Sequence, residues 1–273
     1  QRAVLRNPAV DAAVLETARG GILREGLGFD WCDVAVVTNI GEGDHLGLRG
    51  VHTPEELAQV KATLVKAVSP KGCAVLNAAD PLVVAMARHS QGEVMYFSAE
   101  EDNPVVYQHL SGGGRAVVAS QGWIVLCQAE QRVRLAPLEE VPMTLGGRIH
   151  FQVENALAGV GAAWALGVDQ QHIRQGLASF VGSPPQAPGR FNVFKLHGAT
   201  VIVDFAHNAS ALAALARALD SFPHRQRTII FGGCDRRDED VIRQGQGLGE
   251  GFDCVVLCWD RGDRERWGGG VNE

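Results

Sequence analysis

Residues 34–47 read VAVVTNIGEGDHLG, and this stretch decides which fold to expect. The apolar run at 34–37 has the length and β-branched content of a buried strand, and polar residues follow it directly. In open α/β sheets, ligand-binding and catalytic groups collect at the carboxyl ends of parallel strands. The hydroxyl of Thr38, the amide of Asn39 and the imidazole of His45 are therefore candidate site groups.

Short apolar runs alternate with helical patterns on both sides of this stretch. The helix predicted after it begins with a capping box, Thr53 with Glu56, and has Pro54 at its first position. This alternation predicts a mostly parallel sheet covered by helices. We expect strands at residues 12–16, 34–38 and 74–77, and helices at residues 54–68 and 81–88.

The second half of the chain changes character twice. Residues 94–151 show short alternating runs separated by glycine turns, which predicts an antiparallel hairpin insert, and a helix is expected at 152–166. Residues 184–189, PPQAPG, predict a stiff linker. Beyond the linker, we expect strands at 200–204, 228–231 and 254–257 and helices at 210–219 and 238–248. The predicted division is therefore a central domain (1–183), a linker (184–189) and a C-terminal domain (190–273).

Composition excludes several classes of function. The net charge is -6 and no long basic run occurs, so nothing indicates nucleic-acid binding. No apolar segment approaches the roughly 18 residues that span a membrane. The six cysteines form no C-x-x-C pair, so we expect them, including Cys254 and Cys258, to be buried free thiols of a cytoplasmic protein.

Three segments together resemble the Mur ligase superfamily, whose members use ATP to join an amine to a carboxylate. They are LETARGG at 15–21, TNIGEGDHLG at 38–47 and VDFAHN at 203–208. Within the superfamily, nearly the whole chain resembles the C-terminal, Mur-like half of the ligases that make cyanophycin. The resemblance implies an α/β fold: a Mur ligase-like central domain with a hairpin insert, followed by a truncated, Rossmann-like C-terminal domain.

The resemblance also implies a magnesium centre. Glu16, taken alone, would be an ordinary acid at the end of a strand, but it matches the superfamily's magnesium-binding glutamate. His45 matches the ligand of a second magnesium ion, and Thr38 and Asn39 line the same pocket. Lys61 would otherwise be a surface lysine with a packed stem. In many Mur-type enzymes the lysine at this place is carbamylated and becomes a magnesium ligand.

Further residues match the superfamily's ATP site. The turn at 76–81 reads LNAADP, with Ala79 in place of an acid, and places Asn77 and Asp80 on the adenine side. Asn155 matches the asparagine that faces the nucleotide.

The linker and the residues beyond it carry the rest of the match. Arg190 in PGRF matches the arginine at the phosphates, and its permanent charge and forked geometry suit phosphate oxygens. Asp204 would approach the ribose, and His207 and Asn208 the interdomain cleft; Phe205 replaces the usual tyrosine. The residues with implied catalytic roles are His45, Lys61, Arg190 and His207.

One expected part of such a ligase does not occur in this chain. A P-loop, G-x-x-x-x-G-K-[ST], cradles nucleotide phosphates, yet none of Lys61, Lys66, Lys71 and Lys195 stands in such a motif. We therefore expect the P-loop upstream of Gln1 and interpret the chain as a fragment, shortened at its C-terminal end as well. We expect the fragment alone not to ligate anything.

The resemblance implies a complete reaction for the full-length protein. ATP and Mg²⁺ would activate the β-carboxyl of aspartate in a poly-aspartate backbone as an acyl phosphate, and L-arginine would then displace the phosphate to extend cyanophycin. The full-length protein would be a homo-oligomer. Three alternatives stay open: another Mur-type ligase (a peptidoglycan amino-acid ligase or a folylpolyglutamate synthetase), a non-catalytic scaffold, and a degraded paralogue.

Overall fold

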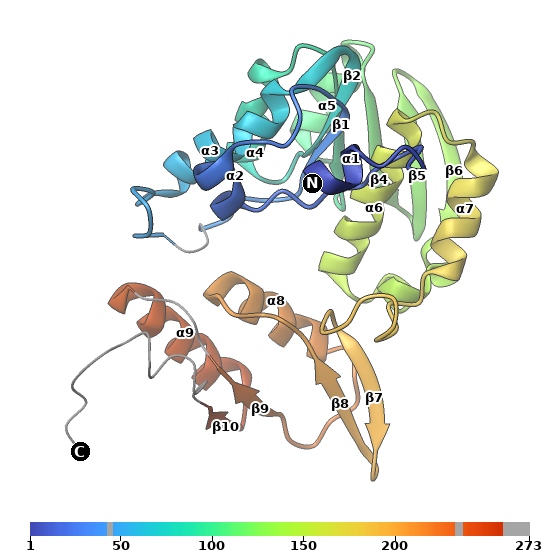
Figure 1. Cartoon of the computed structure of the whole chain (residues 1–273). Helices are drawn as coiled ribbons and strands as arrows, with labels where there is room; N and C mark the ends of the chain where they lie inside the picture. Colours follow the sequence, from blue (N-terminus) through green and yellow to red (C-terminus); the bar gives the residue numbers. More distant parts are fainter. Residues whose placement is uncertain (43–45, 233–236, 259–273) are drawn as a thin grey trace. The chain divides into compact units, whose positions relative to one another are not determined.

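The chain folds into two compact units, Gln1–Val203 and Asp204–Glu273. The structure is a computed structural model that describes residues 1–42, 46–232 and 237–258 (Figure 1). None of the helices in these ranges combines the length and the hydropathy needed to cross a bilayer.

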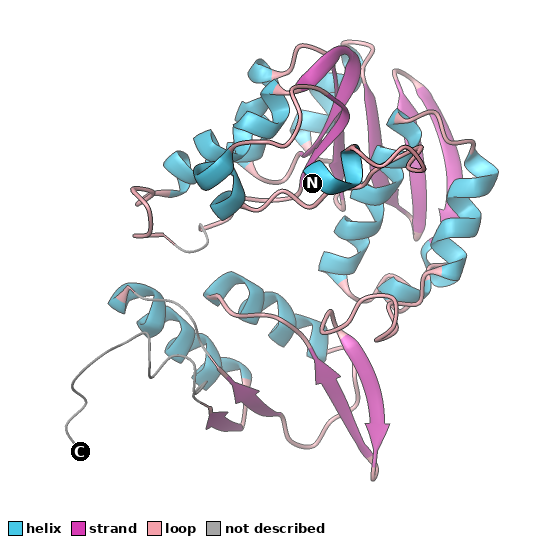
Figure 2. Ribbon diagram, viewed as in Figure 1, coloured by secondary structure: helices cyan, strands magenta, loops and turns pink. Residues whose placement is uncertain are grey.

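The first unit is built on a sheet of six strands (Figure 2). The strands lie in sequence order. The first four strands are parallel, and the last two run antiparallel to their neighbours. The strands are β1 (Cys32–Val37), β2 (Val68–Asn77), β3 (Glu93–Ser98), β4 (Arg115–Ser120), β5 (Trp123–Gln128) and β6 (Gln131–Pro137). The predicted antiparallel hairpin is confirmed for β4–β6. It is wrong for β3, which joins the parallel part of the sheet.

Alternation along the strands gives the sheet two apolar faces. On β2, Ala74 and Leu76 belong to one buried cluster, and Cys73 and Val75 belong to the other. Helices cover both faces, as the predicted α/β class requires (Figure 1). The first face is covered by α3 (Pro54–Lys66), α4 (Pro81–Val84) and α5 (Pro104–Ser111), and the second by α6 (His150–Ala165) and α7 (Gln170–Ser179).

Helix α6 lies very close to the sheet because it presents small residues there. A Cβ atom on Gly161 would lie 2.8 Å from Cγ1 of Val75, and Gly161 is buried. Ala156 and Ala158 are buried on the same helix. The predicted helix at 152–166 is thus confirmed. Its close packing on the sheet requires glycine at position 161.

The N-terminal predictions need two corrections. Residues 12–16 have no regular structure and are mostly exposed; the next element is a helix, α2 (Arg19–Glu25), after a short α1 (Arg2–Leu5). An apolar run becomes a strand only when a neighbour satisfies its backbone groups, and no described strand pairs with this one. The helix predicted at 81–88 divides into α4 and a 3₁₀ helix, Ala85–His89.

A hairpin of β7 (Asn192–Leu196) and β8 (Ala199–Val203) ends the first unit. In the second unit the predicted order of elements is confirmed: α8 (Ala209–Leu219), β9 (Thr228–Phe231), α9 (Asp238–Gly251) and β10 (Cys254–Leu257). Its core includes Leu212, Phe231 and Leu248.

The prediction that the cysteines are buried is only partly right. Cys73 and Cys127 are buried, but Cys32 and Cys254 are half-buried and Cys258 is exposed; Cys234 lies outside the described residues. The reason is that β9 and β10 form a two-stranded sheet with several exposed apolar side chains, including Ile230 and Leu257. The described cysteines are free thiols, as expected.

The half-buried His109 predicts acid-sensitive stability. Burial lowers its pKa below the ordinary value of 6.5, and its ring lies edge-on to Tyr96 at 4.9 Å. The unfolded chain then binds a proton at His109 more readily than the folded one. The stability that neutral His109 contributes to the fold is therefore present above about pH 6.5, and it is lost as the pH falls towards the folded-state pKa. Urea unfolding at pH 7.5 and 5.5 should show that His109→Asn loses less of its free energy of unfolding on acidification than the wild type. Equal acid losses in the two proteins would contradict the prediction.

Candidate functional site

The carboxyl ends of β1 and β2 bring the first polar groups together. The parallel register pairs Val37 with Leu76, so Thr38 and Asn77 leave the sheet side by side. Thr38 and Asn39 are exposed, and the hydroxyl of Thr38 donates to Oδ1 of Asn39 at 3.3 Å. Asn77 is buried, and its Oδ1 accepts a hydrogen bond from the backbone of Ala79 at 2.8 Å. Asn77 therefore shapes the turn after β2, whereas the side chains of Thr38 and Asn39 face solvent.

Asp80 connects this turn to the loop after β1. One carboxylate oxygen, Oδ2, accepts hydrogen bonds from the backbone N–H groups of Ile40 at 2.6 Å and Gly41 at 2.9 Å. The other, Oδ1, accepts from Leu82 at 2.9 Å and Val83 at 3.2 Å and so caps α4. Four backbone donors on two segments thus converge on one side chain. This geometry gives Asp80 the role of fixing the loop that carries Thr38 and Asn39.

Lys61 reaches the same loop from helix α3. Its Nζ donates to the backbone carbonyl of Asn39 at 3.3 Å, and the residue is half-buried. The capping box predicted from Thr53 and Glu56 is present and fixes the start of this helix. The structure therefore gathers Thr38, Asn39, Lys61 and Asp80 at one edge of the sheet.

Asn155 and Arg190 belong to a second place in the same unit. Asn155, on α6, donates from Nδ2 to Oε1 of the buried Gln152 at 3.1 Å. Gln152 and Arg190 both line a cavity of about 210 Å³ beside the segment 181–193. The neighbouring rings of Phe151 and Phe191 meet edge to face with centroids 5.4 Å apart. Arg190, the first residue after the linker, thus lies near the start of α6.

The predicted magnesium ligands are not gathered by the described residues. Glu16 is exposed and lines a cavity of about 460 Å³ together with Thr17 and Glu25; Lys61 is not among the lining residues. His45 lies outside the described residues. Within the described ranges, no group of three or more His, Cys, Asp or Glu is placed to hold a metal ion. Glu16, Thr17 and Glu25 supply oxygen donors, the ligand type that suits Mg²⁺, which is bound through one or two carboxylates plus substrate phosphates.

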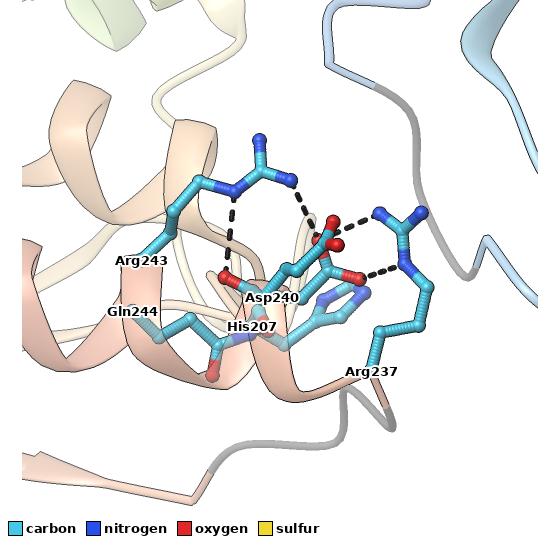
Figure 3. A network of polar contacts seen from close by, with 6 residues as sticks. His207, Arg237, Asp240, Arg243 and Gln244 are labelled. Carbon is cyan, nitrogen blue, oxygen red and sulfur yellow. Dashed lines mark hydrogen bonds and ion pairs between the residues drawn. The ribbon is translucent and has the colours of Figure 1, made fainter.

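The predicted residues of the second unit lie around the start of α8. Oδ1 of Asp204 accepts from the backbone of Ala206 at 2.8 Å, and Oδ1 of Asn208 caps α8 by accepting from Ala211 at 2.8 Å. The backbone carbonyl of His207 accepts from Nε2 of Gln244 on α9 at 3.2 Å (Figure 3). Asp204, His207 and Asn208 are therefore held in one local turn that is tied to α9.

An ionic network fixes the first turns of α9 beside this turn (Figure 3). Asp240 pairs with Arg237 through Oδ2 at 2.5 Å and with Arg243 through Oδ1 at 3.2 Å. The hydrogen bond from Arg237 lowers the pKa of Asp240 below its usual value, and both guanidinium charges act in the same direction. The carboxylate also lies in the first turn of the helix, where negative charge is favourable.

Comparison with known proteins identifies the family of both parts of the chain. The family model described as "Mur ligase middle domain" matches residues 2–163, and "Mur ligase, glutamate ligase domain" matches residues 189–267. The chain is similar to a cyanophycin synthetase of Synechocystis sp., with 44% identity over 267 residues that are 97% of this chain and 30% of that protein. It is 30% identical to a UDP-N-acetylmuramoyl-L-alanyl-D-glutamate–2,6-diaminopimelate ligase of Gloeobacter violaceus, over 84% of this chain and 43% of that protein.

Solved structures show the same fold. An FPGS–AMPPCP–folate complex superposes with a TM-score of 0.59 at 22% identity, covering 85% of this chain and 52% of that one. MurF from Acinetobacter baumannii gives a TM-score of 0.59 at 22% identity, covering 82% and 46%. The chain spans about 30% of the length of the cyanophycin synthetases that it matches. The chain belongs to the Mur ligase family.

Proposed function

We propose that the full-length protein is an ATP-dependent acid–amino-acid ligase of the cyanophycin synthetase type. It adds L-arginine to the β-carboxyl of aspartate in a poly-aspartate backbone. The observation that carries this proposal is the 44% identity to a cyanophycin synthetase over 97% of the chain, against 30% identity to a peptidoglycan ligase over 84%. A homo-oligomeric full-length protein in the cytoplasm is part of the same proposal.

Each site residue has a proposed role that follows from its position. Thr38 and Asn39 present polar groups at the sheet edge, held there by Asp80 and contacted by Lys61. Asn155 faces the nucleotide. Arg190 neutralises charge on the transferring phosphoryl group, which is the main demand of phosphoryl transfer.

The carboxylate substrate is phosphorylated by ATP, and the amine then attacks the acyl phosphate to give an amide, ADP and phosphate. Glu16 would hold a magnesium ion, which supplies further neutralisation of phosphate charge when bound. Asp204 and Asn208 bind the nucleotide, with Asp204 at the ribose, and His207 has a catalytic role. His45 would hold a second magnesium ion, and Lys61, once carbamylated, would be a further magnesium ligand; both would act in catalysis.

Ligation by the full-length protein tests this proposal. With ATP, Mg²⁺ and a short aspartate polymer, we expect L-arginine to be incorporated with one ADP released per amide. Parallel reactions with L-lysine and diaminopimelate serve as the specificity controls. Preferred incorporation of diaminopimelate would replace the proposal with a peptidoglycan-type ligase. The absence of any ATP-dependent amide product would reject the ligase proposal.

A further inference from the structure

Asn192 is a buried hydrogen-bond centre at the end of the linker. It is the first residue of β7 and is only 2% exposed. Its Oδ1 accepts from the backbone N–H of Gly189 at 2.7 Å. Its Nδ2 donates to the carbonyl oxygens of Gly182 at 2.8 Å and Ala187 at 3.0 Å and also contacts that of Arg190 at 3.4 Å. One amide side chain thus ties together both ends of the linker.

The chemistry of this centre requires an amide. A carboxylate could accept from Gly189 but would face three carbonyl oxygens with no hydrogen to donate. Alanine would leave a buried N–H and two or more carbonyl groups without this partner, and burying unpaired polar groups is costly. The contacts of Asn192 therefore fix the linker conformation more tightly than its prolines alone.

Backbone geometry shows that the linker conformation needs such support. Gly182 and Gly189 have φ values of 64° and 68°, in the left-handed region. Phe191 also has a positive φ, 50°, although it carries a side chain, and this conformation is unfavourable for a bulky residue. Phe191 is 6% exposed and packs edge to face on Phe151 of α6. The strained backbone is thus held by one apolar anchor and one polar anchor.

These two anchors directly follow Arg190 in the chain, and the side chain of Asn192 also reaches back across it. Phe191 is its immediate neighbour, and Asn192 contacts Gly189 before it and the carbonyl of Arg190 itself. The side chain of Arg190 is exposed and lines the cavity that it shares with Gln152, the hydrogen-bond partner of Asn155. Any loosening of the two anchors would therefore move the guanidinium relative to α6.

We infer that Asn192 is a positioning residue that holds Arg190 in place for phosphoryl transfer. The inference rests on the proposed function, in which Arg190 meets the phosphates. Because a displacement of about 1 Å in a positioned group can cost roughly 100-fold in rate, losing the Asn192 contacts should impair catalysis strongly while leaving ATP binding nearly intact.

A double-mutant cycle in the full-length protein tests the inference. Asn192→Ala and Asn192→Asp should each lower kcat for ATP-dependent ligation by at least about tenfold, with the KM for ATP changed less than about twofold. When Asn192→Ala is added to Arg190→Ala, the kcat of the double variant should lie within about twofold of that of Arg190→Ala alone. Val106→Ala, a truncation of a buried residue on α5, is the stability-matched control and should keep the wild-type kcat.

A second measurement does not depend on activity. Hydrogen–deuterium exchange at the Gly189 amide should accelerate in Asn192→Ala and stay unchanged in Val106→Ala. Equal effects of Asn192→Ala with and without Arg190, or unchanged exchange at Gly189, would overturn the inference. A wild-type protein that makes no amide would instead reject the proposed function. The exchange experiment would still test whether Asn192 fixes the linker conformation. Wild-type ligation by Arg190→Ala would reject the role of Arg190 and, with it, this inference.

Discussion

Replacing Asp80 with alanine is expected to lower the free energy of unfolding by about 3 kcal/mol. The carboxylate accepts four backbone hydrogen bonds, two from the loop after β1 and two from the first turn of α4. Hydrogen bonds to a charged acceptor stabilise by about 1.5–3 kcal/mol, and a helix cap by about 1 kcal/mol. Urea unfolding followed by circular dichroism measures the loss.

The chain offers two matched comparisons for Asp80. Asp169 caps α7 through the same pair of contacts, to Gln171 and His172, each at 3.0 Å, but no described contact of its carboxylate reaches a distant loop. Asp169→Ala should therefore cost only about 1 kcal/mol. Asp80→Asn retains a single acceptor oxygen. Its loss of unfolding free energy should lie between the losses in Asp80→Ala and Asp169→Ala. Equal losses in Asp80→Ala and Asp169→Ala would show that the contacts to Ile40 and Gly41 contribute nothing.

Arg190→Ala in the full-length protein is expected to lower the ligation rate by about 100- to 1,000-fold. Arginine presents a permanent charge and a planar fork of donors that matches phosphate oxygens. Removing it takes away charge neutralisation that is needed most as the phosphoryl group moves, so kcat should fall much more than the affinity for ATP. Arg190→Lys should recover only part of the rate because an ammonium lacks the fork.

The control for Arg190 is another exposed arginine of the same unit. Arg132 lies on β6 and donates to the carbonyl of Ala129 in the β5–β6 turn and to that of Gln131, the first residue of β6. Arg132→Ala should change the rate by less than about twofold, since exposed side chains away from a site contribute little. A rate for Arg190→Ala within twofold of the wild type would exclude a phosphate-binding role.

The sequence predicted those parts of the fold that depend on local patterns. The capping box at Thr53, the alternation of strands and helices, and the order of elements from β8 onwards were predictable, because each rests on neighbouring residues; strand β7 was missed. Strand pairing was not predictable. Residues 12–16 resembled a strand but have no described partner. Strand β3 looked like part of a hairpin, although it pairs in parallel with β2 and β4, the strands before and after it in the chain.

The candidate site shows the same limit. Residue types and their order indicated Thr38, Asn39, Lys61 and Asp80, but not that Asp80 would serve the loop of Thr38 and Asn39 through backbone contacts. Asn192 was missed because a buried asparagine after an apolar residue resembles any turn residue. The only available signal was its position three residues after Gly189, where a side-chain oxygen can accept from the glycine N–H.

The mixed sheet has a consequence for the order of folding. Strands β4, β5 and β6 are joined by tight turns, so their pairing closes only short loops. The pairing of β1 with β2 must wait until the whole segment between Val37 and Val68 has folded back, and such non-local contacts form slowly. We therefore expect the edge that carries Thr38, Asn39, Lys61 and Asp80 to assemble late. A chain that has only partly refolded can hold most of its secondary structure and still lack this edge, which makes the geometry around Asp80 a sensitive measure of complete folding.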